Sequence, residues 1–144
     1  MSIRPLFTAV ATATGGRNGH AAAQDGSLRV DLSVPEALGG PAKPHTTTPE
    51  HLFAAGYAAC FGSALDYVAS RAGKHAKSAA VTCSVSIGRR GGGGFGLAVR
   101  LHVVDARIPQ TELEALARIA HEKICPYSQA MRGNVQVDLS VEGA

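Results

Sequence analysis

The sequence has no tryptophan, few other aromatic residues and few charges. Of its 144 residues 5% are aromatic, 17% are charged and 45% are hydrophobic. A sequence with this large a hydrophobic fraction is not intrinsically disordered. Because aromatic side chains are scarce, the core must consist mainly of Ala, Val and Leu, and a chain of this length buries only about two-thirds of its unfolded surface. We therefore expect a single domain over residues 1–144, stabilised by association with a second copy.

A strong excess of charge of one sign is also missing. The net charge is +3, and the Lys and Arg residues are scattered apart from the pair Arg89-Arg90. Without a basic stripe interleaved with aromatics, we expect no nucleic-acid partner. The N-terminal MSIRPLF lacks the apolar run of a signal peptide, and the uncharged stretch 51–65 is shorter than the about 20 residues that span a bilayer. The expected location is cytoplasmic, with no membrane partner.

Cysteine is rare, with Cys60, Cys83 and Cys125 as the only three. An odd number at wide spacing is not the disulfide framework of a secreted protein. Each is then either a small buried hydrophobe or a reactive thiol. Cys83 alternates with serines in a predicted strand and shares its face with valines, which predicts a core residue. Position alone leaves both interpretations open for the other two.

Alternating apolar and polar residues predict strands at residues 6–14, 28–34, 81–87, 97–103 and 135–139. Residues 20–24, which follow the turn at 15–19, are expected to return as a further strand. Asp25-Gly26 predicts a hairpin turn between this strand and the one at 28–34. Residues 35–48 contain three prolines and two glycines, which predicts a long loop.

Two helices are expected between the strands. The first begins at Pro49 after a capping Thr48 and is ended by Gly73. Residues 52–69 are apolar on nearly every face, which predicts burial on all sides. The second follows Pro109 and stops at Cys125, because Pro126 disfavours helical geometry in the residue before it. This order of elements predicts an α+β fold in which antiparallel sheets wrap around a buried central helix.

Motifs for other kinds of chemistry are weak or absent. His121 and Cys125 have a spacing that could share a metal ion, but two ligands do not make a site and no C-x-x-C or H-E-x-x-H pattern supports one. The run Gly91–Gly94 lacks the Lys-Ser/Thr of a phosphate loop, and no G-x-S-x-G elbow is present. We therefore expect no metal and no bound cofactor.

Several segments resemble, in the right order, the organic hydroperoxide resistance proteins, which are thiol peroxidases of the OsmC-like superfamily. Residues 48–61, TPEHLFAAGYAACF, resemble the central helix of that family. The resemblance continues at TGGRNG (14–19), at LGG (38–40), and from ICPYS (124–128) to RGN (132–134). The departures are Thr48, where Asn is common, and Cys83, which lies outside the family pattern.

The resemblance implies a role for each of four residues. Cys60 would be the peroxidatic nucleophile and Cys125 the resolving cysteine, while Arg17 would stabilise the Cys60 thiolate and Glu50 would orient Arg17. The chemistry is reasonable, because only a thiolate reacts and burial raises a thiol pKa unless a cation opposes it. The resemblance also implies an intertwined homodimer, organic hydroperoxides as substrates and an external lipoyl dithiol as reductant.

Two other functions remain open at this point. One is a broader peroxidase of the sister, osmotically inducible branch, although the Ala-Ala-Gly-Tyr form of the helix favours the organic hydroperoxide branch. The other is a non-catalytic dimer that binds an apolar ligand beside inert cysteines.

The spacing of Glu50 and Cys60 has a consequence for assembly. Ten residues on one helix correspond to a rise of about 15 Å, too far for both to serve one site. Either the helix breaks, or Glu50 serves the Cys60 of another subunit. We expect a dimer with antiparallel central helices, in which Gly56, Gly62 and the many alanines allow close approach of another helix.

Overall fold

The computed structural model describes residues 2–144 in two compact units, one up to Leu52 and the other from Phe53 to Ala144. Helix α1 (Pro49–Arg71) begins in the first unit and continues in the second. Each unit is described by itself below. The expectation of one domain over residues 1–144 stays a prediction.

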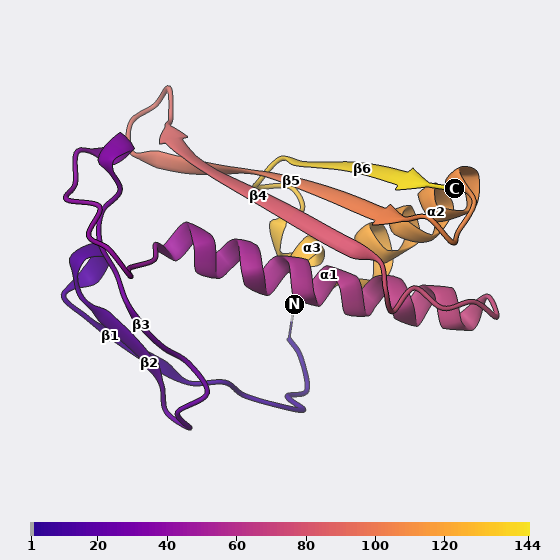
Figure 1. The fold of residues 1–144 in the computed structure, drawn as a ribbon, viewed down its shortest axis with the longest axis horizontal. Helices are drawn as coiled ribbons and strands as arrows, with labels where there is room; N and C mark the ends of the chain where they lie inside the picture. Colours follow the sequence, from indigo (N-terminus) through magenta and orange to yellow (C-terminus); the bar gives the residue numbers. More distant parts are fainter. Residues whose placement is uncertain (1) are drawn as a thin grey trace. The chain divides into compact units, whose positions relative to one another are not determined.

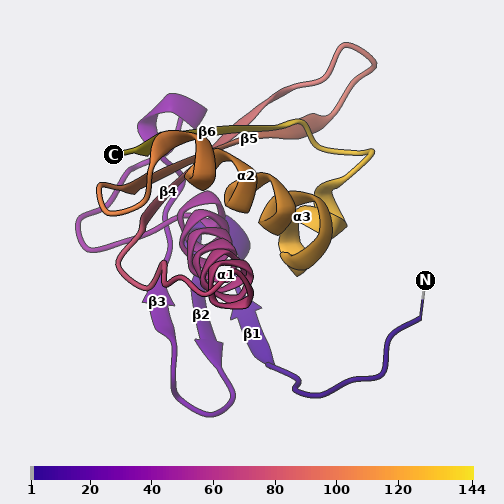
Figure 2. The same cartoon turned by 90° about the vertical axis from the view of Figure 1, so that its right-hand side faces the viewer.

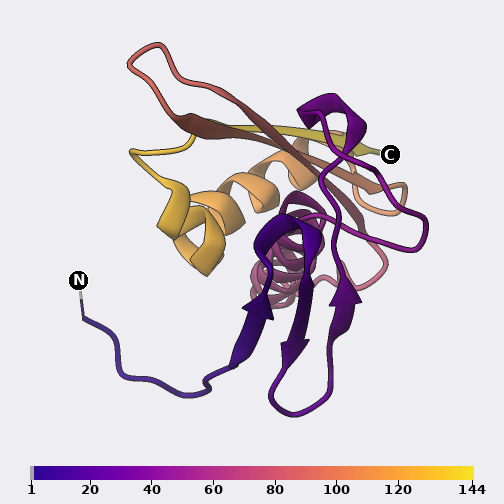
Figure 3. The same ribbon diagram turned by 90° about the vertical axis from the view of Figure 1, so that its left-hand side faces the viewer.

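The first unit contains a small antiparallel sheet of strands β1 (Ala11–Thr14), β2 (His20–Ala23) and β3 (Arg29–Asp31), in that order (Figure 3). All three predicted strands are present, and Gly26 forms the expected hairpin turn with a positive φ of 78°. The first strand is shorter than predicted. Ala11 already pairs with Ala23, the last residue of β2, so residues 6–10 extend past the end of their neighbour.

The connection from β3 to α1 is the predicted long loop, with a single 3₁₀ turn (Glu36–Leu38) inside it. Its end is tied back by a bridge between Leu32 and Thr47. Thr48 caps the helix as predicted, because its hydroxyl oxygen accepts the backbone N–H of His51 at 3.2 Å.

The second unit is built on a sheet of strands β4 (Ala80–Arg89), β5 (Phe95–Asp105) and β6 (Val137–Gly143). Within this unit α1 and α2 (Gln110–Ile119) lie on the same face of the sheet (Figures 1 and 2). Apolar residues of all these elements meet in one core, whose largest fully buried members are Tyr57, Phe61, Leu65, Val99, Leu101, Val103 and Leu113.

The prediction of purely antiparallel sheets is wrong for β6, which pairs with β5 in parallel. Val99 lies opposite Val137, and Leu101 lies opposite Leu139. The reason is the helical connection between these strands, which returns the chain to the end of the sheet where β5 began. Such a crossover gives parallel pairing, whereas a tight hairpin such as that between β4 and β5 gives antiparallel pairing.

The prediction that α1 is buried on all sides does not hold for this chain by itself. One face is buried, whereas an opposite stripe four residues apart is exposed, at His51, Ala55, Ala59, Ser63 and Tyr67. A helix that is apolar all round does not reveal which of its faces its own chain covers. Among residues 2–144, α1 is also the one helix long and apolar enough to cross a membrane, a test that core helices pass equally well.

The two helix glycines make room for the chain itself. A Cβ at Gly56 would lie 3.5 Å from the Tyr127 side chain, and a Cβ at Gly62 would lie 3.7 Å from Val81. Both glycines therefore face packed neighbours of the same unit, and the close approach of a second helix would use the exposed stripe of α1 instead.

The predicted helix end at Cys125 is confirmed, but the chain reaches it by an unpredicted route. After α2 it widens into a π-helical turn (Ala120–Ile124), closed by a 2.8 Å bond from the Cys125 N–H to the Ala120 carbonyl. Cys125 is extended, with ψ at 115°, as its position before Pro126 requires. A short helix, α3 (Pro126–Met131), follows, which the sequence pattern did not predict.

Candidate active site

Arg17 lies in a tight 3₁₀ turn (Gly16–Asn18) between β1 and β2. Gly15 and Gly16 have φ angles of 82° and 59°, in the left-handed region that favours glycine. Gly19 is required for space, since a Cβ there would lie 1.7 Å from the Thr14 carbonyl oxygen. The backbone of this turn thus fixes where the Arg17 side chain starts.

Arg17 and Glu50 form a bidentate ion pair. Arg17 donates from Nη1 to Oε2 at 2.8 Å and from Nη2 to Oε1 at 2.6 Å. Glu50 lies in the first turn of α1, where the helix dipole favours a carboxylate. The structure therefore brings together two of the four predicted site residues, within the first unit.

The pair shifts the pKa of both members toward the charged state. Hydrogen bonding from Arg17 lowers the Glu50 pKa below its usual 4.5, against an opposing effect of burial. Hydrogen bonding to Glu50 raises the pKa of Arg17. The exposed fractions of the side chains are 37% for Arg17 and 14% for Glu50, so the guanidinium keeps an open side that other groups can approach.

Cys60 and Cys125 meet in the second unit. Cys60 projects from the middle of α1 and is half-buried, whereas Cys125 is fully buried at the bend before α3. Both are free thiols, and their sulfur atoms are 3.7 Å apart although 65 residues separate them in the chain. A disulfide needs about 2.05 Å between sulfurs, so a side-chain adjustment of less than 2 Å would join them.

The surroundings of Cys60 oppose its ionisation. Burial raises the pKa of its thiol above the usual 9.0, the Tyr127 backbone N–H lowers it, and the nearby Cys125 raises it further. Within the second unit, residues 53–144, no cation contributes to this shift. A peroxidatic Cys60 would therefore need a positive charge brought to it.

A buried hydrogen-bond network lies beside the two cysteines, and sequence reasoning missed it. The Tyr57 hydroxyl is 2.7 Å from the Ser128 hydroxyl, which in turn is 2.8 Å from Nδ1 of His121. Tyr57 and Ser128 are 0% and 1% exposed. The available signals were a tyrosine within an apolar helix and a serine three residues after Cys125.

The remaining candidates have structural explanations. Cys83 is half-buried and packs against the core of its unit, in agreement with the prediction, and burial raises its pKa. His121 uses Nδ1 for Ser128. Between Ser2 and Ala144 no group of three or more His, Cys, Asp or Glu side chains comes together as a metal site would require.

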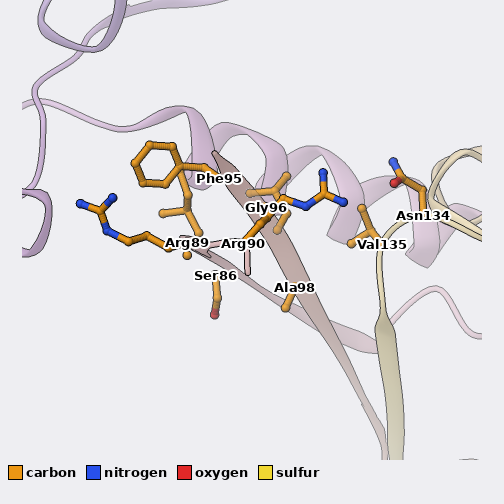
Figure 4. A pocket seen from close by; sticks show the side chains of 11 residues that line it. Ser86, Arg89, Arg90, Phe95, Gly96, Ala98, Asn134 and Val135 are labelled. Atoms are coloured by element: carbon orange, nitrogen blue, oxygen red, sulfur yellow. The ribbon is translucent and has the colours of Figure 1, made fainter. Parts of the chain in front are cut away.

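A separate pocket of about 520 Å³ lies at the turn end of the β4–β5 hairpin. Arg89 and Arg90 extend in opposite directions there, and the Arg89 guanidinium lies 5.6 Å from the centre of the Phe95 ring (Figure 4). None of the four predicted site residues lines this pocket. The catalytic roles of those four residues stay predictions that rest on the two contacts described above.

Comparison with known proteins shows the family to which the chain belongs. A family model described as "OsmC-like protein" matches residues 40–140. The organic hydroperoxide resistance protein of Xanthomonas axonopodis pv. citri is 46% identical over 137 residues, covering 94% of each chain. The organic hydroperoxide resistance protein OhrA of Bacillus subtilis is 42% identical over 139 residues, covering 96% of this chain and 97% of its own.

Solved structures agree with this relationship. An organic hydroperoxide resistance protein from Elizabethkingia anophelis superposes with a TM-score of 0.90 at 44% identity, covering 99% of this chain and all (100%) of its own. A putative one from Vibrio cholerae, with captopril bound in one of its active sites, also gives 0.90, at 42% identity and 98% and 95% coverage. The chain therefore belongs to the OsmC-like family, in its branch of organic hydroperoxide resistance proteins, and the predicted family fold is confirmed.

Proposed function

We propose that this chain is a thiol-dependent peroxidase that reduces organic hydroperoxides to alcohols and so detoxifies them. The observation that carries the proposal is the 3.7 Å separation of the Cys60 and Cys125 sulfurs in the second unit. Two free thiols in contact, one half-buried and one fully buried, have the arrangement of a peroxidatic and a resolving cysteine. The names of the relatives support hydroperoxides as the substrate class.

The proposed reaction has three balanced steps. The Cys60 thiolate attacks the outer peroxide oxygen, the O–O bond breaks, and the alkoxide takes a proton to leave as an alcohol, while Cys60 becomes a sulfenic acid. The Cys125 thiol then attacks the Cys60 sulfur, which forms a disulfide and releases water. An external dithiol reduces the disulfide and is itself oxidised, and we propose a lipoyl group for this part because of the family resemblance.

Arg17 is proposed to supply the cation that Cys60 lacks. Arginine stays charged when buried and has several donors, so it can stabilise the thiolate and bind the departing alkoxide oxygen. Glu50 would hold the guanidinium through two hydrogen bonds, which leaves the other edge for the reaction.

The substrate selectivity is proposed to come from aromatic side chains. Phe53 and Tyr57 make an edge-to-face contact at 6.1 Å between ring centres, and Tyr57 and Tyr127 make another at 5.8 Å. Phe53 and Tyr57 lie on α1 in the turns before Cys60, and Tyr127 packs against both of them. This apolar cluster would favour organic hydroperoxides over hydrogen peroxide.

A homodimer is proposed to complete the site. Helix α1 is continuous from Pro49 to Arg71, so the alternative of a break between Glu50 and Cys60 does not occur. The small side chains along the exposed stripe of α1 would let a second α1 pack closely. Residues 3–10 add exposed apolar surface, with Leu6 97% and Phe7 83% exposed, which a second copy would cover.

The peroxidase proposal is tested by measuring consumption of tert-butyl and cumene hydroperoxide with a lipoyl dithiol, compared with thioredoxin and glutathione. Wild type should turn over with the lipoyl dithiol, whereas Cys60→Ser should not. Equal consumption by the two proteins would show that the assignment of Cys60 is wrong.

Because the proposed reaction begins from the reduced thiols of Cys60 and Cys125, we also propose the cytoplasm as the location.

The shared site is tested by mixing two inactive variants, Cys60→Ser and Arg17→Ala. After random exchange of equal amounts, half of the dimers are mixed, and one of the two sites in each mixed dimer combines an intact Cys60 with an intact Arg17. About a quarter of all sites should therefore regain activity. No recovery, with exchange verified by mass spectrometry, would mean that each chain supplies its own Arg17.

A further inference from the structure

The bond between Tyr57 and Ser128 is a buried polar link between helix α1 and the segment that carries Cys125. Tyr57 lies on α1, three residues before Cys60, and Ser128 lies on α3, three residues after Cys125. Each hydroxyl-bearing residue is therefore three positions from a cysteine in the chain, and the two hydroxyl oxygens are 2.7 Å apart while the two sulfurs are 3.7 Å apart. A bond that keeps Tyr57 against Ser128 would thus also help to keep Cys125 close to Cys60.

The segment that carries Cys125 also has hydrogen bonds within itself. The Gln129 amide donates to the Glu122 carbonyl at 2.8 Å, and Arg132 donates to the His121 carbonyl at 3.0 Å. These bonds join α3 to the π turn before it, so that residues 120–132 form one hydrogen-bonded segment, called the Cys125 segment below. The Cys125 segment can thus shift against α1 without losing its own hydrogen bonds.

The hydrogens of the network have one arrangement in which both hydroxyl protons are donated. Tyr57 donates to Ser128, Ser128 donates to Nδ1 of His121, and His121 carries its proton on Nε2. The reverse direction would leave the buried Tyr57 hydroxyl proton without an acceptor among residues 2–144. Burial raises the pKa of Tyr57, which keeps it a neutral donor.

We propose that Tyr57 and Ser128 are positioning residues for the second chemical step. Their hydrogen bond, completed by His121, holds the Cys125 segment against α1. Cys125 then reaches the Cys60 sulfenic acid before a second hydroperoxide does. This inference rests on the proposed function. The competing reaction is defined, because a second hydroperoxide converts the sulfenic acid to a sulfinic acid and is itself reduced to an alcohol. The ratio of disulfide to sulfinic acid therefore reports on positioning.

The test uses Tyr57→Phe, which removes the hydroxyl and keeps the ring in the core. The matched control is Ser84→Ala, which removes the hydroxyl of an exposed serine on β4 of the same unit. Each protein is treated with stoichiometric and with excess cumene hydroperoxide. A dimedone trap measures the rate of sulfenic acid formation, and intact mass measures the final ratio of disulfide to sulfinic acid.

In Tyr57→Phe we expect sulfenic acid to form within about twofold of the wild-type rate. The ratio of disulfide to sulfinic acid should fall about tenfold, because one buried hydrogen bond that positions Cys125 is lost. Ser128→Ala should match it, Ser128→Thr should restore part of the ratio by keeping a hydroxyl, and Ser84→Ala should equal wild type. An unchanged ratio in Tyr57→Phe would overturn the inference, and so would an equal fall in both steps, which indicates general destabilisation. A wild type that forms neither oxidised species would instead overturn the proposed function.

Discussion

Replacing Arg17 by Lys tests whether the geometry of its ion pair, rather than its charge alone, matters. Lysine keeps the positive charge but cannot make two parallel bonds to Glu50. A hydrogen bond to a charged group contributes about 1.5–3 kcal/mol, and a fully exposed ion pair about 0.2–1 kcal/mol. With Arg17 37% exposed and Glu50 14% exposed, this pair lies between those limits, and we expect a coupling of about 1 kcal/mol.

A double-mutant cycle measures that coupling. The free energy of unfolding in urea is determined for wild type, Arg17→Lys, Glu50→Gln and the double variant, with Arg29→Lys as a control at an exposed arginine of the same unit. The double variant should be less destabilised than the sum of the single variants by about 1 kcal/mol. The Cys60 oxidation rate should likewise fall in each single variant with little further loss in the double. Effects that add within about 0.3 kcal/mol would refute a functional unit of the two residues.

Three further changes have defined outcomes. In Cys125→Ser, the Cys60 sulfenic acid should persist and no disulfide should form, which intact mass with a dimedone trap will show; a disulfide through Cys83 would contradict the assignment. Burial and, as a smaller effect, the charge of Arg132 lower the His121 pKa below 6.5, although Glu122 opposes the shift. The contribution of neutral His121 to stability should therefore be complete above about pH 6.5 and be lost as the pH falls toward the lowered pKa. Wild type should therefore lose more unfolding free energy than His121→Asn between about pH 7.5 and pH 5.5, and parallel losses would disprove the buried neutral histidine. Gly19→Ala should destabilise the Arg17 turn by at least about 2 kcal/mol in urea unfolding, because its Cβ would overlap the Thr14 carbonyl at 1.7 Å, whereas Gly88→Ala, with no atom within 4 Å, should cost about 0.5 kcal/mol or less.

Local sequence patterns were sufficient for most of the secondary structure. Alternation located the strands other than β2, which followed from the glycine-rich turn before it. Thr48 and Pro126 marked the start of one helix and the end of another, and Asp25-Gly26 marked a hairpin. These signals act within a few residues, so they can be read one element at a time. Residues 6–10 show the limit, because alternation indicates a capacity to form a strand and only a neighbouring strand satisfies the backbone.

Features that depend on distant segments could not be predicted in the same way. Whether β6 runs parallel to β5 depends on where the helical connection leaves the chain, and no residue of β6 encodes that. The contact of Tyr57 with Ser128 joins residues 71 positions apart. The four site residues were identified from a resemblance, since spacing alone could not show that Arg17 faces Glu50 or that Cys60 faces Cys125.

The parallel pairing of β6 has a consequence for folding in the cell. Cys125 lies in the crossover between β5 and β6, so it is synthesised 65 residues after Cys60 and before the strand that completes the sheet. Contacts of such long range form late, because the loop between them must close first. We therefore expect a growing chain to emerge with its two thiols apart, and the pair to become competent for oxidation only when the last strand has docked.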